Sequence, residues 1–194
     1  LQIPTTPMIF TKFPSALGRP CATVTLPGAT TDWEAELVVV IGRSIRNVTP
    51  SAALGYVAGY MVGQDYSERA VQMANNPAQF SLGKSFENFA IAGPYLTTAD
   101  AVSNPQDLEI RCDVNGQVMQ RESTGDMAYS VAEIVSHISS VCELRAGDLI
   151  YTGSPAGVGQ GQIPPRFLSP GDRVTTEISG LGSITNTFLG SGND

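Results

Sequence analysis

Histidine and cysteine are scarce in this sequence, and each scarcity excludes a kind of site. His137 is the only histidine, which excludes a metal site built from several imidazoles. It would also have to act alone as the base of any Ser–His or Cys–His hydrolase, and its helix-like surroundings favour a structural role. The three cysteines, Cys21, Cys112 and Cys142, are far apart and in no metal-ligand spacing, so we expect free thiols in a cytoplasmic protein.

Basic residues and long apolar runs are also lacking. Eleven Lys and Arg residues oppose 18 Asp and Glu residues, a formal net charge of −7, which excludes the basic surface that nucleic-acid binding requires. No apolar run approaches the ~18 residues of a membrane span. No segment resembles a signal peptide. We therefore expect neither a nucleic acid nor a membrane as a partner.

Strand-like segments outnumber helix-like ones, and the two do not alternate regularly. Residues 108–122 alternate around an Asn-Gly pair, which predicts a hairpin with a type I′ turn. A capping box at Ser130 predicts a helix after it. Shorter helices are expected over 48–61, with Pro in the first turn, and from Ser67. Without an internal linker, residues 1–194 are expected to form a single domain, mainly β with peripheral helices (α+β).

One segment combines a buried strand with acidic residues. Asp32–Gly42 reads DWEAELVVVIG, in which a continuous apolar run predicts a buried strand. Side chains alternate across a strand, so Glu34 and Glu36 share one face, with Cα atoms roughly 6–7 Å apart. Two like charges at that spacing repel unless both face water or a cation lies between them. The segment alone leaves both interpretations open, a solvated edge and a divalent-cation site.

Asp65 is the candidate third carboxylate of such a cation site. It ends an apolar, strand-like run just before a polar turn, where functional side chains are often displayed. Three carboxylates form an all-oxygen set, which suits Mg²⁺, Mn²⁺ or Ca²⁺ and not structural zinc. Such a site leaves about three octahedral positions for water or substrate.

Six sequence blocks together resemble the fumarylacetoacetate hydrolase family, over residues 7–188. The blocks are DWEAELVVVIG, GYMVGQDYSERAVQ, SLGKSFENFAIAGP, VNGQVMQ, LRAGDLIYTGSPAGVG and FLSPGDRVTTEISGLGSITNTF. The resemblance is to the C-terminal catalytic domain and implies a mixed β-sandwich roll. It also implies a homodimer that binds Mg²⁺ or Mn²⁺, with Ca²⁺ as a substitute in a crystal, and that acts on small keto acids.

The resemblance also assigns roles to particular residues. The family's E-x-E ligands fall on Glu34 and Glu36 and its third ligand falls on Asp65, which favours the cation site over the solvated edge. The family's active-site lysine falls on Lys84 in GKSF. A lysine beside a carboxylate cluster can neutralise charge and stabilise an enolate.

Three further residues are implied to bind substrate. The family's Arg and Gln after the aspartate fall on Arg69 and Gln72, at helical spacings that can direct both toward the pocket of Asp65. Arginine suits bidentate contact with a carboxylate. The family's T-G-T-P turn appears as TGSP over 152–155, so its substrate-contacting hydroxyl falls on Ser154.

The largest departure from the family lies at the front of the sequence. Hydrolytic and decarboxylating members carry a His-x-x-Glu-type pair on a mobile lid upstream of the block seen here as PMIFTK. We expect this N-terminal lid segment to be absent from residues 1–194, and His137 lies in the wrong place to replace its histidine.

The reaction implied by the resemblance has several alternatives. The first expectation is a divalent-metal-dependent hydrolase that cleaves a C–C bond in an acylpyruvate or a fumarylacetoacetate-like keto acid. An oxaloacetate-type decarboxylase is the second expectation and a 2-hydroxy-diene-dioate isomerase is the third. A catalytically inactive metal-binding subunit is the alternative of another class.

Overall fold

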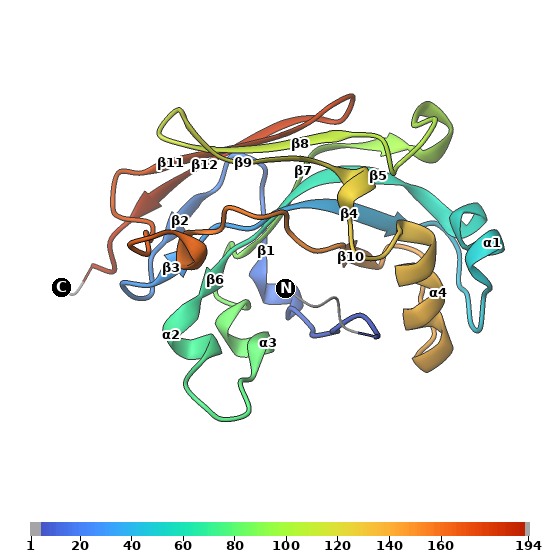
Figure 1. Ribbon diagram of the computed structural model, residues 1–194, viewed down its shortest axis with the longest axis horizontal. Coiled ribbons are helices and arrows are strands. Elements are labelled where there is room, and N and C mark those ends of the chain that lie inside the picture. Colours follow the sequence, from blue (N-terminus) through green and yellow to red (C-terminus); the bar gives the residue numbers. More distant parts are fainter. Residues whose placement is uncertain (1–4, 193–194) are drawn as a thin grey trace.

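Two five-stranded sheets pack against each other in the computed structural model, which describes residues 5–192. They form the upper and lower layers of Figure 1. The lower sheet contains, in spatial order, β1 (Leu17–Gly18), β7 (Ala90–Thr98), β5 (Val57–Asp65), β4 (Ala35–Ile41) and β10 (Leu149–Tyr151). The upper sheet contains β2 (Thr23–Thr25), β12 (Gly182–Leu189), β11 (Arg173–Ile178), β8 (Glu109–Val114) and β9 (Gln117–Ser123). A short ribbon pairs β3 (Thr31–Asp32) with β6 (Ser67–Glu68).

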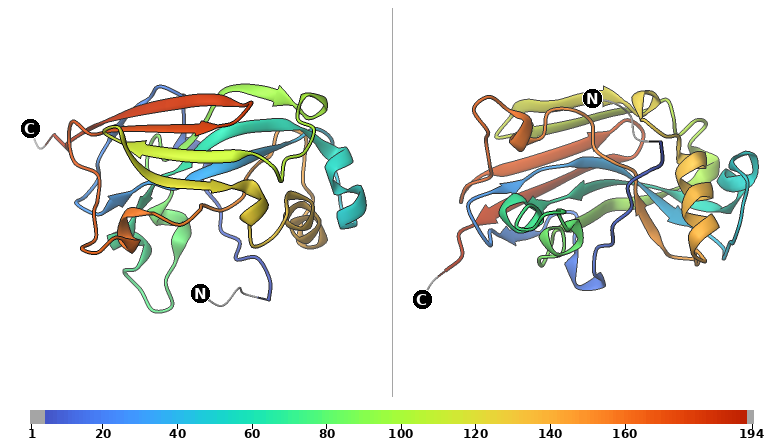
Figure 2. Two further views of the ribbon diagram at one scale, coloured as in Figure 1. Left: turned by 45° about the horizontal axis from the view of Figure 1, so that its top comes forward. Right: turned by 60° about the horizontal axis from the view of Figure 1, so that its bottom comes forward.

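Few and mostly short helices lie around the sheets. They are α1 (Pro50–Ala53), α2 (Arg69–Gln72), α3 (Phe80–Gly83) and α4 (Val131–Val141). In Figure 1, α1 packs beside α4 at one end of the sandwich, and α2 packs beside α3 below the lower sheet. Figure 2 shows the same pairs from two further sides. Short 3₁₀ turns lie at Pro14–Ala16, Leu54–Tyr56, Ala99–Ala101, Thr124–Asp126 and Gly159–Gly161. No helix in the described part of the chain is both long and apolar enough to cross a membrane.

The apolar core lies between the sheets, and the burial of the strands follows from this. In β11 the buried residues alternate with more exposed ones, as expected for a strand with one face on the core. In β4 all seven residues are buried, because the outer face of the lower sheet is covered as well. The mainly β fold with peripheral helices, predicted from the sequence, is confirmed.

The strongest local patterns form the elements they predict. The hairpin turn has positive φ at Asn115 and Gly116, 54° and 81°. The Ser130–Glu133 capping box is present at the start of α4. None of the three cysteines forms a disulfide, and Cys112 is buried whereas the other two are exposed.

The helix expected over 48–61 is wrong in its second half. The helix ends at Ala53 and a 3₁₀ turn follows, after which the chain runs as β5 from Val57. This strand is hydrogen-bonded on both sides, to β4 and to β7, and this pairing overrides the helical pattern. The helix expected from Ser67 begins two residues later, at Arg69, because Ser67 and Glu68 pair with β3.

Candidate metal centre

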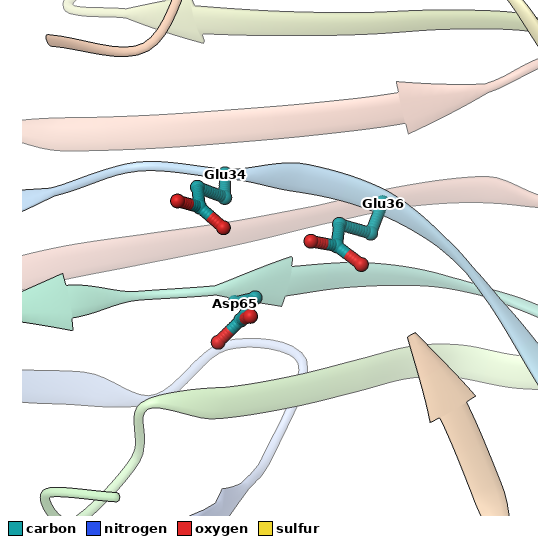
Figure 3. Close-up of side chains that lie close together, drawn as sticks. All are labelled: Glu34, Glu36 and Asp65. Atoms are coloured by element: carbon teal, nitrogen blue, oxygen red, sulfur yellow. The ribbon is translucent and has the colours of Figure 1, made fainter. Parts of the chain in front are cut away.

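Three carboxylates converge on the outer face of the lower sheet. Glu34 directly precedes β4, Glu36 lies within it, and Asp65 ends β5. The backbone N–H of Asp65 donates to the carbonyl of Glu34 at 2.9 Å, so these two residues lie opposite each other. Opposite residues, and residues two apart on one strand, share a face. One carboxylate oxygen from each residue lies within 4.8 Å of the others, and Figure 3 shows the three side chains directed toward common space.

The charge balance of this cluster fits a cation. Glu36 is only 2 % exposed, and within residues 5–192 it has no ion-pair partner; the N–H of Gly153 donates to its Oε2 at 2.7 Å. Burial raises the pKa of Glu36 well above its ordinary value, and the negative charges of Asp65 and Glu34 raise it further. A cation among the three carboxylates would offset this cost. The donor set contains only oxygen, which suits a hard cation such as Mg²⁺, Mn²⁺ or Ca²⁺.

Lys84 lies beside the same cluster. Its Nζ donates to Glu34 Oε2 and to Asp65 Oδ2, both at 2.7 Å, and to Ser67 Oγ at 2.8 Å. Burial alone would lower the pKa of Lys84, but the surrounding carboxylates outweigh burial and raise it. Lys84 is therefore a fixed positive charge at the edge of the cluster.

Arg69 and Gln72 lie beside the cluster, but their polar groups contact other protein groups and not the cavity. The Arg69 guanidinium is 2.7 Å from Glu34 Oε1 and 2.8 Å from Asp32 Oδ2. It also donates to Gln72 Oε1 at 2.8 Å. Both side chains are buried. Neither is among the described residues that line the cavity beside the cluster, which is described below. Their predicted contact with substrate stays a prediction.

A cavity of about 890 Å³ lies beside the carboxylates. This volume is within the range of small-molecule sites, about 300–1,000 Å³. Glu36, Asp65 and Lys12 form part of its wall, together with apolar side chains that include Ile134 and Ile138 of α4. The cavity thus joins charged groups to an apolar wall, which suits a small organic acid.

The TGSP turn brings Ser154 to this cavity. Thr152 Oγ1 donates to the carbonyl of Leu37 in β4 at 2.9 Å, which ties the turn to the acidic strand. Gly153 has φ of 100°, a left-handed conformation that favours glycine, and its N–H points at Glu36. Ser154 follows directly and lines the cavity.

Two charged residues near the site were missed by the sequence analysis. Lys12 forms an ion pair with Asp65 Oδ1, and burial lowers the pKa of Lys12 although Asp65 opposes the shift. Asp32 is fully buried and accepts hydrogen bonds from the backbone N–H of Gly159 at 2.6 Å and from Arg69. Both lie in segments already singled out, PMIFTK and DWEAELVVVIG, yet only the tertiary structure reveals their partners.

Comparison with known proteins identifies the family. The family model described as fumarylacetoacetate (FAA) hydrolase C-terminal matches residues 1–189. A protein of Bos taurus named oxaloacetate tautomerase FAHD2A, mitochondrial, is 43% identical over 97% of this chain and 61% of its own length. A Dictyostelium discoideum protein named fumarylacetoacetate hydrolase domain-containing protein 2 homolog is 41% identical over 96% of this chain. The chain spans about three fifths of the length of such curated relatives.

Solved structures with the same fold carry several enzyme names. A putative HpcE protein from Mycobacterium smegmatis has a TM-score of 0.94 and 46% identity, covering 96% of this chain and 69% of that one. A putative fumarylpyruvate hydrolase from Burkholderia cenocepacia has a TM-score of 0.85 and 34% identity, covering 94% and 78%. The order of the sequence blocks, the fold and these matches agree, and the chain belongs to the fumarylacetoacetate hydrolase family.

Proposed function

We propose that this chain is the catalytic part of a divalent-metal-dependent enzyme that isomerises a small 2-oxo acid through its enol form. Glu34, Glu36 and Asp65 would hold one Mg²⁺ or Mn²⁺. Members of the family carry the names of tautomerases, isomerases and hydrolases, so a reaction of a keto acid is common to them. The site beside the cavity supports this class of chemistry.

The contact of Lys84 with two of the three carboxylates is the observation that carries the proposal. A bound divalent cation would act as a Lewis acid that polarises an oxygen of the substrate. Lys84 adds a preorganised positive charge 2.7 Å from Glu34 and from Asp65, and through its charge it would stabilise an enolate bound at the cation. Arg69 keeps Glu34 in place from the other side, at 2.7 Å.

Isomerisation is favoured over the other reactions by the names of similar proteins. The relative from Bos taurus that matches 97% of this chain is named an oxaloacetate tautomerase. A structure from Mycobacterium marinum, 36% identical over 98% of this chain, is titled 2-hydroxyhepta-2,4-diene-1,7-dioate isomerase. Both names describe movement of a proton without loss of carbon.

Hydrolysis of a C–C bond, the first expectation from the sequence, is the second candidate. The fumarylpyruvate hydrolase structure at 34% identity supports it. Decarboxylation and an inactive metal-binding subunit stay as predictions. The homodimer also stays a prediction. The cytoplasmic location does too, because mammalian relatives are named as mitochondrial.

The proposal is tested by product analysis on Mn²⁺-loaded protein with oxaloacetate, a 2-hydroxy-diene-dioate and an acylpyruvate. We expect interconversion of enol and keto forms faster than the uncatalysed rate, with no carbon lost. Lys84→Ala should lower turnover by about 10²-fold or more, with a smaller change in KM, because the charge that Lys84 offsets develops in the transition state. Cleavage products would favour hydrolysis instead, and full activity in Lys84→Ala would contradict the role of Lys84.

A further inference from the structure

Two buried glutamines hold the acidic strand at neighbouring positions. Gln64 Oε1 accepts the backbone N–H of Glu34 at 2.9 Å, and Gln120 Oε1 accepts the backbone N–H of Ala35 at 3.0 Å. The two side chains are 0% and 1% exposed. Each satisfies a strand N–H that would otherwise be buried without a partner, at the point where the strand carries its carboxylates.

The second end of Gln120 lies on the TGSP turn. Its Nε2 donates to the carbonyl of Pro155 and to Ser154 Oγ, both at 2.8 Å. A backbone N–H can only donate and a backbone carbonyl can only accept, so Ala35 and Pro155 together fix which end of the amide is oxygen. Rotating the amide by 180° would place donor against donor at Ala35 and acceptor against acceptor at Pro155.

This fixed orientation determines how the Ser154 hydroxyl is used. Because the Gln120 Nε2 is only a donor, Ser154 Oγ accepts in that bond, and no group within residues 5–192 accepts the hydrogen of Ser154. Ser154 lines the cavity together with Glu36 and Asp65, and the preceding N–H, of Gly153, binds Glu36. The hydrogen is therefore available to an oxygen atom of a molecule in the cavity.

We propose that Gln120 is a positioning residue that keeps the Ser154 hydroxyl a hydrogen-bond donor toward a carboxylate or enolate oxygen of the substrate. The inference rests on the proposed function, because that function supplies the anionic ligand. Without the Gln120 amide, the Pro155 carbonyl loses its donor and becomes an acceptor for the Ser154 hydrogen. The hydroxyl would then be turned away from the ligand.

Gln64 provides a matched control. It is the same residue type, it is equally buried, and it holds the adjacent N–H of the same strand. Its Nε2 donates to Thr176 Oγ1 at 2.7 Å and to Cys112 Sγ at 3.3 Å instead of to the turn. Gln64→Met and Gln120→Met each leave one strand N–H without its acceptor. Only Gln120→Met also removes the donor that binds Ser154 Oγ.

The test measures oxalate binding to the Mn²⁺-loaded full chain by calorimetry, with Mn²⁺ affinity measured separately. We expect Gln120→Met to weaken oxalate binding about 10-fold, the scale of one hydrogen bond to a charged group, and to leave Mn²⁺ affinity unchanged. Gln64→Met should leave oxalate affinity within about twofold. Combining Gln120→Met with Ser154→Ala should weaken oxalate no more than Ser154→Ala alone, because both changes remove one interaction.

Gln120→Glu keeps the acceptor for Ala35 and so tests the proposal even where Gln120→Met folds poorly. The introduced carboxyl, once ionised, accepts from Ser154 instead of donating to it. Oxalate affinity should therefore fall with rising pH more steeply than in the wild type. In a Ser154→Ala background that extra fall should be smaller, because only charge repulsion remains.

Several results would overturn the role of Gln120. Equal loss of oxalate affinity in Gln64→Met and Gln120→Met would show that only strand support matters. Additive losses in the double variant would show that Gln120 does not act through Ser154. Absence of Mn²⁺ binding by the wild type would instead contradict the proposed function, and the inference with it, so the two failures are distinguishable.

Discussion

The two sheets contain similar strands but bury different kinds of side chain. In the upper sheet, Val174, Thr176 and Ile178 of β11 alternate with more exposed residues, and the buried face is mostly apolar. In the lower sheet, β4 is buried on both faces and begins beside a cluster of charges. The upper sheet therefore contributes to stability mainly through apolar burial, whereas the lower sheet also buries carboxylates, whose removal from water works against stability.

The lower sheet compensates most of its buried charge with opposite charge. Lys84 pairs with both Glu34 and Asp65, and Lys12 pairs with Asp65 as well. Arg69 bridges Asp32 and Glu34. Glu36 is the carboxylate of the three that no described cation contacts, and burial, together with the charges of Asp65 and Glu34, raises its pKa. Among the described residues, the lower sheet thus keeps one buried carboxylate without an opposite charge in contact, which supports the proposed cation site.

The largest expected effect on stability comes from the upper sheet. Ile178 is fully buried, so Ile178→Ala should lower the free energy of unfolding by about 2–5 kcal/mol, because apolar contacts are lost and a cavity remains. Urea denaturation measures this loss. The Mn²⁺ affinity of the folded variant should match that of the wild type. A clear drop in affinity would show that packing in the upper sheet also affects metal binding in the lower sheet.

A change at Glu36 should have the opposite effect. Glu36→Gln removes a buried, unpaired charge, so the metal-free protein should gain about 1 kcal/mol in its free energy of unfolding while losing Mn²⁺ binding. Urea denaturation in the presence of a chelator measures the gain. Glu68→Gln is a suitable control, since Glu68 is equally buried but belongs to a different cluster, bonded to Thr31 at 2.7 Å. A loss of stability in Glu36→Gln would contradict the account.

The same charge predicts a pH dependence. The pKa of Glu36 is raised in the folded state above the ordinary value of 4.5, so folding favours its protonated form. Its contribution to stability is present below about pH 4.5 and is lost as the pH rises through the folded-state pKa. The advantage of metal-free Glu36→Gln over the wild type should therefore grow with pH, as unfolding curves from pH 5 to 8 would measure. A constant advantage would show that Glu36 does not titrate as described.

A comparably small effect is expected in the hairpin of the upper sheet. Gly116 has φ of 81° and open space around the position of a Cβ atom, so Gly116→Ala introduces backbone strain without a clash. The free energy of unfolding should fall by about 1 kcal/mol, which a thermal or urea transition can resolve, and Mn²⁺ binding should not change. An unchanged transition would mean that the turn can adopt another conformation.

The sequence predicted the parts of the site that depend on local geometry. Strand alternation alone brings Glu34 and Glu36 to one face, and the hairpin and the capping box form as their sequences require. The position of Asp65 beside them depends on the register of β4 with β5, which strand alternation does not determine.

The partners of the buried polar groups depend on long-range contacts. The contact between Gln120 and Ala35 joins residues 85 positions apart, and the pairing of Lys12 with Asp65 spans 53. No local sequence period encodes such contacts. The blocks VNGQVMQ and PMIFTK therefore gave no role to Gln120 or to Lys12. The helix predicted over 48–61 overlaps the start of β5 for the same reason. Pairing with β4 and β7, which lie elsewhere in the sequence, makes this segment a strand.

A titration with Mn²⁺, followed by electron paramagnetic resonance, tests the central claim most directly. The wild type and Glu68→Gln should each bind one ion per chain, and Glu36→Gln should bind it at least about 100-fold more weakly, because a ligand is lost. Equal affinity in the wild type and Glu36→Gln would contradict a metal centre formed by Glu34, Glu36 and Asp65.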